Sequence, residues 1–463
     1  MKKEKPMGSV PRLVMPALLL AGVAAAKIVG AAQAPPAKPT PTFARDIAPI
    51  FQRSCQVCHR PDSIAPMSLL TYQDARPWAR SIRNKVVARE MPPWYIDRSV
   101  GIKKFKNDPS PTDEEVDLIA RWVDAGAPMG NPAEMPPPRQ FDDLDRWHIQ
   151  PDLIVRLPQD ITVPAAGPDR WLDVLVDAGL TEDRYLQAVE TKPIKGHRVV
   201  HHSVQTMRDA DDDGAPGTGG SFLNEYALGK NADVFPDGAG RLFKAGTKIN
   251  FNLHLHSIGE ATPANVEVAL KFYPKGYTPK HIETTTTVGN SGERELDLPP
   301  NTDNVRTDGY TVLTQPVRLL SFQPHMHNRG KAMCVEAIYP PAPTPADPAA
   351  ALFGPTAAAV PRVETLSCVD RYQFAWHIVY LYDEDLQPLL PAGTILHTIG
   401  YHNNTASNRF NPDPDNLVTF GQRTIDDMSF AWMSWYPLSD EEYRQQVKER
   451  EEKNKGKTTQ NQQ

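Results

Sequence analysis

The sequence predicts a multidomain protein in which a small all-α domain precedes two all-β antiparallel sandwich domains. Three observations predict this fold class. The length of 463 residues suggests about three domains of ~150 residues. The 46 prolines disfavour a mostly helical chain. After residue 140, short apolar runs with alternating polarity, such as Val266 to Leu270, are typical of antiparallel sheets.

The first 34 residues predict an export signal. Basic residues precede an apolar run from Leu13 to Ala26, and small residues follow as far as Ala34, which is the order of a signal peptide. The run is shorter than the ~20 residues that span a membrane comfortably. Pro35 would block cleavage after Ala34, so an uncleaved anchor stays open, and membrane contact is expected only in that case. We expect a periplasmic or extracellular protein.

The net charge excludes one class of partner. The formal charge is −6, and no basic stripe is present, so we expect no nucleic-acid surface.

The segment Cys55-Gln56-Val57-Cys58-His59 is the attachment pattern of a c-type haem. The thiols of Cys55 and Cys58 would form thioethers to the haem vinyls, and His59 would be the proximal iron ligand. A redox dithiol and a zinc half-site are the alternatives, but neither needs a histidine directly after the second cysteine. We therefore expect one covalent haem c.

Two methionines, Met91 and Met67, are candidates for the distal haem ligand. Met91 precedes Pro92 and follows a stretch, 75–89, that we expect to be helical. A second helix is expected over 112–125, opened by a capping box at Thr112 and closed by Gly126. Residues 43–130 thus resemble a class I cytochrome c, which implies Met91 as the ligand and an electron-carrying haem. A proline-rich linker, 131–139, follows.

Four segments in the predicted sandwiches, 140–275 and 276–440, carry metal-binding side chains. They are His201-His202, His254-Leu255-His256, His325-Met326-His327 and Asp426-Asp427-Met428. His325 and His327 would share one face of a strand. The adjacent His201 and His202 would bind one metal only at a bend or a strand end. Three imidazoles form one copper ligand set, and two imidazoles with a thioether form another, in which sulfur favours Cu(I).

The order of these segments over residues 140–440 resembles the copper type II, ascorbate-dependent monooxygenases, the family of dopamine β-monooxygenase and peptidylglycine α-hydroxylating monooxygenase. Further matches are Gly330-Lys331 and the asparagine-rich stretch from Tyr401-His402-Asn403-Asn404 to Asn408 and Asn411. The family's fold would be two jelly-roll sandwiches facing each other across a solvent cleft, with one copper each.

The resemblance implies two sites with different roles. An electron-transfer copper would lie at His201, His202 and either His254 or His256, and an oxygen-binding, catalytic copper at His325, His327 and Met428. We prefer His254, because Gly259 then takes the place of the glycine that commonly follows the ligand in related bacterial sequences. Leu255 departs from the tyrosine that the family usually has after this ligand.

The expected activity is hydroxylation of a C–H bond in a small organic substrate with O₂. The fused haem would supply single electrons to the first copper, and an external donor would refill the haem. Two alternatives stay open: a periplasmic electron-transfer or copper-handling protein without hydroxylase activity, and a haem subunit of a larger respiratory assembly.

Three further expectations complete the sequence analysis. Cys334 and Cys368 should form a disulfide in an exported protein. His377, His397 and His402 are expected to be structural, or to support metal ligands from behind, rather than to be ligands themselves. Residues 441–463 should form a charged tail that is partly disordered.

Overall fold

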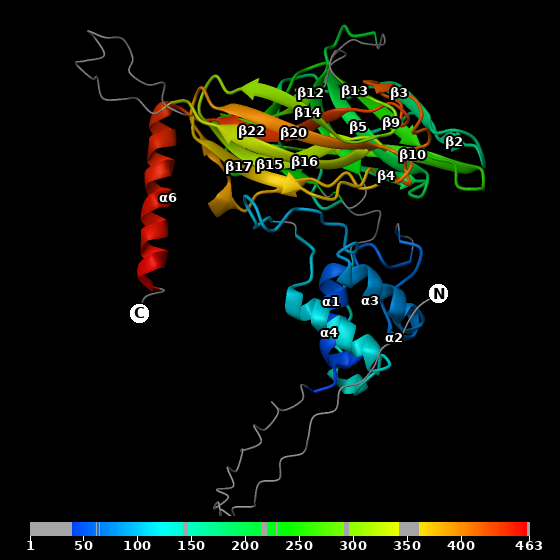
Figure 1. Ribbon diagram of the computed structural model, residues 1–463. Coiled ribbons are helices and arrows are strands. Elements are labelled where there is room, and N and C mark those ends of the chain that lie inside the picture. Colours follow the sequence, from blue (N-terminus) through cyan, green and yellow to red (C-terminus); the bar gives the residue numbers. More distant parts are fainter. Residues whose placement is uncertain are drawn as a thin grey trace, which may run out of the picture. The chain divides into compact units, whose positions relative to one another are not determined.

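The computed structural model describes residues 39–61, 63, 65–106, 108–141, 147–213, 220–227, 230, 232–290, 296–341 and 361–460. These residues are mostly β-sheet with few helices, which confirms the predicted β-rich architecture (Figure 1). All of the elements lie in one compact unit, Pro41–Gln463. The predicted signal peptide, 1–34, lies outside the described residues. No helix among them is long and apolar enough to cross a membrane.

Short helices between residues 43 and 134 share one hydrophobic cluster. Trp122 is fully buried there and contacts the rings of Phe43 and Phe51. Thr112 and Glu115 form the predicted capping box, each side chain accepting a backbone N–H of the other residue. The elements are η1 (Phe43–Ile47), α1 (Ala48–Ser54), α2 (Tyr72–Ala75), η2 (Arg76–Trp78), α3 (Ala79–Val87), α4 (Asp113–Asp124) and η3 (Pro132–Glu134). The cytochrome identity of this region stays a prediction.

The segment from Trp94 to Phe105 departs from the predicted helical domain of residues 43–130. Its apolar side chains belong to the core of the second sandwich. Phe105 forms a β-bridge with Tyr382, and the ring centroids of Trp94 and Tyr380 are 4.7 Å apart. The helical region is therefore anchored to the β region through the middle of its own sequence.

The first sandwich consists of a seven-stranded and a four-stranded sheet. Their inner faces meet in a single cluster that includes Val268 and Leu270 from one sheet and Phe251 and Leu253 from the other. The larger sheet contains β1 (Leu153–Arg156), β2 (Ile161–Val163), β4 (Arg184–Lys195), β7 (Asp233–Val234), β8 (Ala239–Phe243), β10 (Thr262–Phe272) and β11 (His281–Ile282). The smaller sheet has the order β3 (Arg170–Asp177), β9 (Lys248–Leu255), β5 (Val200–Arg208), β6 (Ser221–Ala227). β11 follows the predicted boundary at residue 275 but still pairs with β8.

The second sandwich packs a five-stranded sheet against a four-stranded sheet. The five-stranded sheet contains β12 (Thr284–Asn290), β22 (Ser429–Pro437), β15 (Val317–Met326), β18 (Tyr380–Leu381) and β19 (Leu389–Leu390). The other has the order β14 (Thr302–Val312), β20 (Ile395–Asn404), β16 (Gly330–Ile338), β17 (Val363–Val369). A separate pair is formed by β13 (Asp297–Leu298) and β21 (Val418–Thr419), and η4 (Glu384–Leu386) precedes β19.

Because side chains alternate along β15, every second one points away from the core of the second sandwich. Phe322 and Met326 are fully buried in that core. Because side chains alternate along a strand, Ser321, Gln323 and His325 point to the opposite face of the sheet. That face meets the first sandwich.

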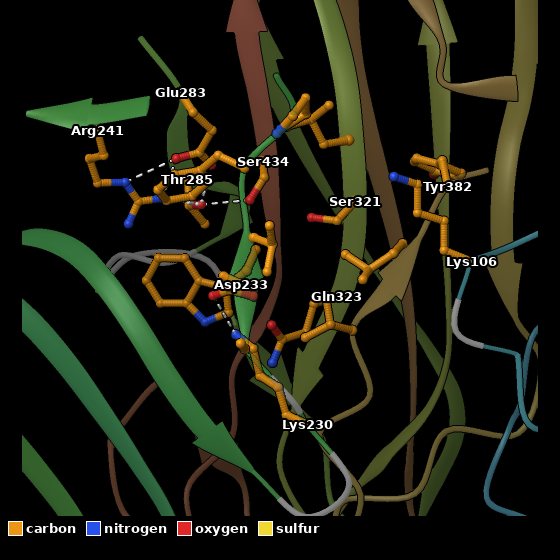
Figure 2. A pocket seen from close by; sticks show the side chains of 18 of the residues that line it. Lys106, Lys230, Asp233, Arg241, Glu283, Thr285, Ser321, Gln323, Tyr382 and Ser434 are labelled. Atoms are coloured by element: carbon orange, nitrogen blue, oxygen red, sulfur yellow. Dashed lines mark hydrogen bonds and ion pairs between the residues drawn. The ribbon is translucent and has the colours of Figure 1, made fainter. Parts of the chain in front are cut away.

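The two sandwiches contact each other directly. Gln323 on β15 donates to Glu225 on β6 at 2.6 Å, and the rings of Phe222 and Trp432 lie 4.9 Å apart. A pocket with an internal volume of about 100 Å³ lies along this contact. Figure 2 shows the Arg241–Glu283 ion pair on one side of the pocket and Ser321 with Gln323 on the other. One face of β15 thus lines the pocket and also carries His325.

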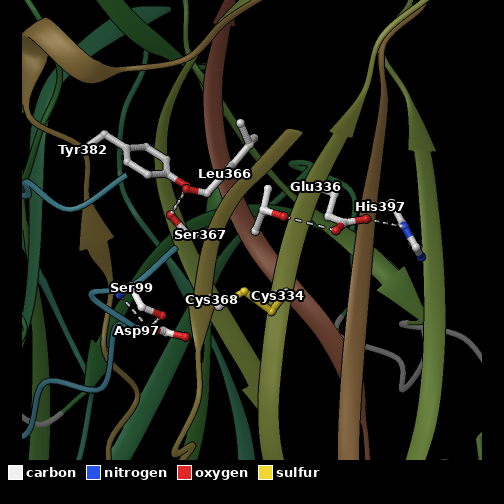
Figure 3. The surroundings of a disulfide bond; sticks show 10 residues. Asp97, Ser99, Cys334, Glu336, Leu366, Ser367, Cys368, Tyr382 and His397 are labelled. Carbon is white, nitrogen blue, oxygen red and sulfur yellow. Dashed lines mark hydrogen bonds and ion pairs between the residues drawn. A yellow bond between two sulfur atoms is a disulfide. The ribbon is translucent and has the colours of Figure 1, made fainter. Parts of the chain in front are cut away.

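The predicted disulfide is confirmed. Cys334 on β16 stands directly opposite Cys368 on β17, and their sulfur atoms are bonded (Figure 3). The bond links residues that are 34 positions apart in the sequence. It therefore fixes the edge strand β17 to the rest of its sheet.

The last helix, α6 (Asp440–Gln460), covers most of the charged C-terminal segment. Arg450 donates to the carbonyl of Gln387 at 2.8 Å, which holds one face of α6 against the second sandwich.

Removing the disulfide should destabilise the protein without changing its fold. A Cys334→Ala/Cys368→Ala double variant should lose about 2–4 kcal/mol of unfolding free energy, since the unfolded chain regains the entropy that the cross-link removes. Urea unfolding measures this loss, and non-reducing peptide mapping of the wild type should recover the linked pair. Free thiols at both positions would contradict the assignment.

Trp94 should be essential to the second sandwich. Trp94→Ala should cost about 3–5 kcal/mol, because the buried indole leaves a cavity beside Tyr380. Trp78→Ala is the matched control, since Trp78 is 47% exposed and its loss should change stability by less than about 0.5 kcal/mol. Equal urea midpoints for both variants would show that the segment does not anchor the sandwich.

Candidate metal centre

A β-bulge at His201 brings two adjacent imidazoles together. Val200 pairs with Leu255 and His202 pairs with His254, so His201 is the extra residue on β5. A bulge re-aims a side chain that would otherwise point to the opposite face. The Nδ1 atoms of His201 and His202 are 3.1 Å apart. The bend that the sequence required for this pair is present.

His254 joins that pair from the neighbouring strand β9. Its ring centroid is 4.9 Å from those of both His201 and His202, and its Nδ1 is 3.4 Å from Nδ1 of His202. Trp171 on β3 stacks on its ring at 4.1 Å. The carboxylate of Asp169 lies 2.7 Å from Nε2, so this nitrogen has a partner and Nδ1 faces the other histidines.

His256 does not join the cluster. Its side chain is 60% exposed and its Nδ1 is 2.7 Å from the other oxygen of Asp169. This geometry favours His254 over His256 as the ligand, although the assignment stays a prediction.

His325 and His327 lie at the end of β15, as the spacing predicted. Their ring centroids are 5.3 Å apart. Phe430 on β22 stacks on His325 at 4.7 Å. The carbonyl oxygen of Asp426 is 3.2 Å from Nδ1 of His327, which leaves Nε2 of that ring for a metal.

Asp427 links His327 to Met428. The carboxylate of Asp427 is fully buried, and its Oδ1 accepts the backbone N–H groups of both His327 and Met428 at 2.9 Å. Burial by itself would raise the pKa of Asp427, but nearby His402 and these backbone donors lower it overall. One ionised carboxylate therefore holds the two chain segments that carry the predicted ligands side by side.

Arg329 fixes the loop that precedes Met428, a role the sequence analysis missed. Its side chain is buried, and it donates to Asn404 at 2.8 Å and to the carbonyl of Ile425 at 2.9 Å. Asn404 in turn donates to the carbonyl of Asn416 at 3.0 Å. A charged residue after His327 gives no sequence signal of burial, so only the asparagine-rich stretch pointed to this loop.

His377 is one of the three histidines for which the sequence predicted a structural or supporting role rather than metal ligation. It lies between β17 and β18 and is 2% exposed. Its ring centroid is 4.9 Å from His202, 5.9 Å from His201 and 5.3 Å from His325. It therefore stands between the two predicted ligand sets, which the family resemblance would place on opposite sides of an open cleft. No sequence spacing signals this position, because a loop delivers it.

The histidines at the centre are held neutral. Burial lowers the pKa of His201 to about 4 and that of His325 to about 3. Burial also lowers the pKa of His202 and of His377 well below the usual range. A neutral imidazole offers a lone pair to a metal ion, whereas a protonated one does not. The residues present thus fit a transition metal.

The segment Cys55 to His59, predicted to attach haem, follows α1. Burial raises the pKa of the Cys55 thiol to about 12, opposite to the shift that a redox dithiol needs. The carbonyl oxygen of Met67 is 3.2 Å from Nδ1 of His59, so Nε2 is the nitrogen left for iron. Met91 lies elsewhere, in a pocket that also includes Arg371.

No protein-family model matches the chain, and no curated protein matches it. Two matching solved structures come from infectious bursal disease virus. The VP2 subviral particle shares 9% identity, covering 61% of this chain and 70% of that chain, with a TM-score of 0.18. The Gx strain structure shares 6% identity, covering 64% and 74%, also with a TM-score of 0.18. Scores this low carry no argument about the fold or the function.

Proposed function

We propose that this protein is an exported copper-dependent monooxygenase that hydroxylates a C–H bond with O₂ and draws its electrons through a covalent haem c. The proposal includes the finer parts of the predicted fold, namely a class I cytochrome c domain and jelly-roll sandwiches. The predicted family, the copper type II monooxygenases, belongs to the proposal as well.

One observation carries the proposal: imidazoles from both sandwiches converge on one region. His201, His202 and His254 gather from β5 and β9, and His325 and His327 reach the same region from β15. His377 lies within ring-contact distance of both groups. Such a concentration of buried imidazoles suits copper, and a purely structural role would leave both ring nitrogens of His377 unpaired at a cost.

The chain's own residues would divide the work between two sites. His325, His327 and Met428 would hold the copper that meets O₂, and His201, His202 and His254 would hold the copper that relays electrons. Copper supplies one-electron redox chemistry, and thioether ligation favours its reduced form. Asp169 would orient His254, and the Asp426 carbonyl would orient His327, as outer partners of ligating histidines commonly do.

The haem assignment rests on His59 and its surroundings. The Met67 carbonyl contacts Nδ1 of His59, so the Met67 backbone lies at the ring nitrogen opposite Nε2, the nitrogen that would bind the iron. This position favours Met91 over Met67 as the distal ligand. Met91 is followed by Trp94, which is anchored in the second sandwich, so the ligand loop has a fixed end.

The pocket along β15 is the proposed place for the organic substrate. Ser321 and Gln323 line it, and His325 is the next residue on the same face of the strand. Phe222 and Trp432 supply apolar walls. A small molecule with both apolar and polar groups would suit this lining.

An electron-transfer or copper-handling protein is the second candidate function. The observation that favours it is the tight packing of aromatic rings around the histidines. Phe374 lies 5.8 Å from His201 and 5.6 Å from His327 between ring centroids. Close packing of this kind suits electron relay between metals. Membership in a larger respiratory assembly would be a variant of this function.

Met428→Ile should abolish O₂ chemistry and spare the rest of the protein. The variant removes the sulfur ligand but keeps the volume of the side chain. Copper should fall from two ions per chain towards one, with the haem unchanged, because the second site loses its third ligand. Metal analysis, X-ray absorption for the copper–sulfur scatterer, and O₂ consumption by the reduced protein with candidate substrates measure these effects.

The control for Met428→Ile is Met207→Ile, which changes a partly buried methionine on β5 that packs against the first core. It should keep both coppers and full O₂ consumption. Zinc in place of copper, or copper content unchanged in a Met428→Ile/His325→Ala double variant, would contradict the monooxygenase. Intact copper binding without any O₂ consumption in the wild type would favour the electron-transfer function.

The haem should be covalent and ligated by Met91. Cys55→Ala/Cys58→Ala should lose the haem-stained band on denaturing gels, since no thioether can form. Met91→Ala should abolish the weak sulfur-to-iron absorption at the red edge of the oxidised spectrum, and Met67→Ala should leave it in place. The reverse result would assign Met67 as the distal ligand.

A further inference from the structure

His377 is buried without a partner for either ring nitrogen. The side chain is 2% exposed, and neither Nδ1 nor Nε2 has a hydrogen-bond partner among the residues that the structure describes. The nearest carboxylate oxygen, on Glu225, is 3.7 Å from Nδ1, beyond hydrogen-bond length. Buried polar groups in folded proteins are almost always paired, and an exception points to an ion or a water that completes the site.

The surroundings of His377 select an ion. His377, His201 and His202 each offer a ligand atom, and these atoms all lie within 4.8 Å of one another. Three imidazole nitrogens at such separations can converge on one metal ion by small side-chain rotations. We propose that His377 is a metal ligand that shares one transition-metal ion with His201 and His202, so that both sandwiches hold the same ion.

The donor set defines the class of metal. Imidazole nitrogens suit copper and zinc, and the absence of carboxylates among the three donors disfavours calcium and magnesium. Glu225 fits as the outer partner of His377, because Gln323 fixes its other carboxylate oxygen at 2.6 Å. A carboxylate beside the non-ligating nitrogen is the common arrangement behind a metal-bound histidine. Nε2 of His377 would then face the ion.

With His377 as a ligand, the metal ion would connect the two sandwiches. His201 and His202 belong to β5 of the first sandwich, whereas His377 follows β17 of the second. An ion bound by all three would clamp the sandwiches together. His254 contacts His202 through Nδ1 and is available as a fourth imidazole. His325 also lies beside His377, so the clamp would set the spacing between the two predicted copper sites.

The proposed ion shared by His377, His201 and His202, which we call the clamp, concerns metal binding alone. It does not depend on the monooxygenase activity. The full chain, stripped of metal, is titrated with Cu(I) against a competing chelator without oxygen, and separately with Zn(II). His377→Ala should weaken metal binding at this site by at least about tenfold. Removing only an outer partner of a metal ligand commonly costs about that much, and removing a ligand should cost no less. X-ray absorption should count one imidazole fewer on the metal.

The metal-free protein supplies a readout that a structural histidine would not give. Because His377 has no hydrogen bond to lose, His377→Ala should lower the metal-free Tm only through the cavity that the missing ring leaves, while the rise in Tm on adding metal should shrink. His397→Ala is the matched control. His397 is also buried, but it is paired with Asp308 at 2.7 Å and Glu336 at 3.4 Å, so its loss should lower the metal-free Tm and spare metal affinity.

His377→Gln is the second variant and serves if the alanine variant does not fold, because glutamine keeps most of the side-chain volume. A wild type that takes up neither Cu(I) nor Zn(II) would overturn the clamp. Wild-type affinity together with the full metal-induced rise in Tm in either folded variant would also overturn it. Metal binding that depends on His377 without O₂ consumption would instead reject only the proposed monooxygenase.

Discussion

The buried carboxylate of Asp427 is the interaction on which the arrangement of the second ligand set depends. It accepts backbone N–H groups from His327 and Arg329 at the end of β15 and from Met428 at the start of β22. Three such donors stabilise the ionised form in a site where a lone charge would be costly. Without this acceptor the ladder between β15 and β22 would still end at the pair Met326 and Ser429, but His327 and Met428, which lie just beyond it, would lose the group that they share.

Buried polar groups that satisfy each other also fix the contact between the two sandwiches. Arg329 and Asn404 fasten the Met428 loop, and Gln323 with Glu225 fastens β15 to the first sandwich. Each is a buried polar pair whose members satisfy one another, so each fixes position as well as adding stability. His377 does not follow this pattern, since neither of its ring nitrogens has a hydrogen-bond partner among the described residues. A bound ion would make the network complete at that point.

The helical region is tied to the β region by packing rather than by a linker alone. The segment around Trp94 and Phe105 contributes aromatic rings to the second core. The sequence predicted a proline-rich linker over residues 131–139 and did not predict this second connection. In the sequence, the apolar residues after Met91 are equally consistent with the lining of a haem pocket and with the core of a β-sandwich. Sequence patterns give polarity and spacing, but not the partner against which a side chain packs.

The sequence by itself determined the β-rich class, the ends of α4, the Cys334–Cys368 pair and the strand position of His325, with His327 directly after the strand. These follow from alternation, capping chemistry and residue type, which act over a few neighbouring residues. It also showed that His201 and His202 need a bend. Only the tertiary structure decided that a bulge against β9 supplies this bend, that His254 and not His256 faces the cluster, and that His377 reaches it from a distant loop. Those outcomes depend on strand register and loop path, which are set by contacts between residues far apart in the chain.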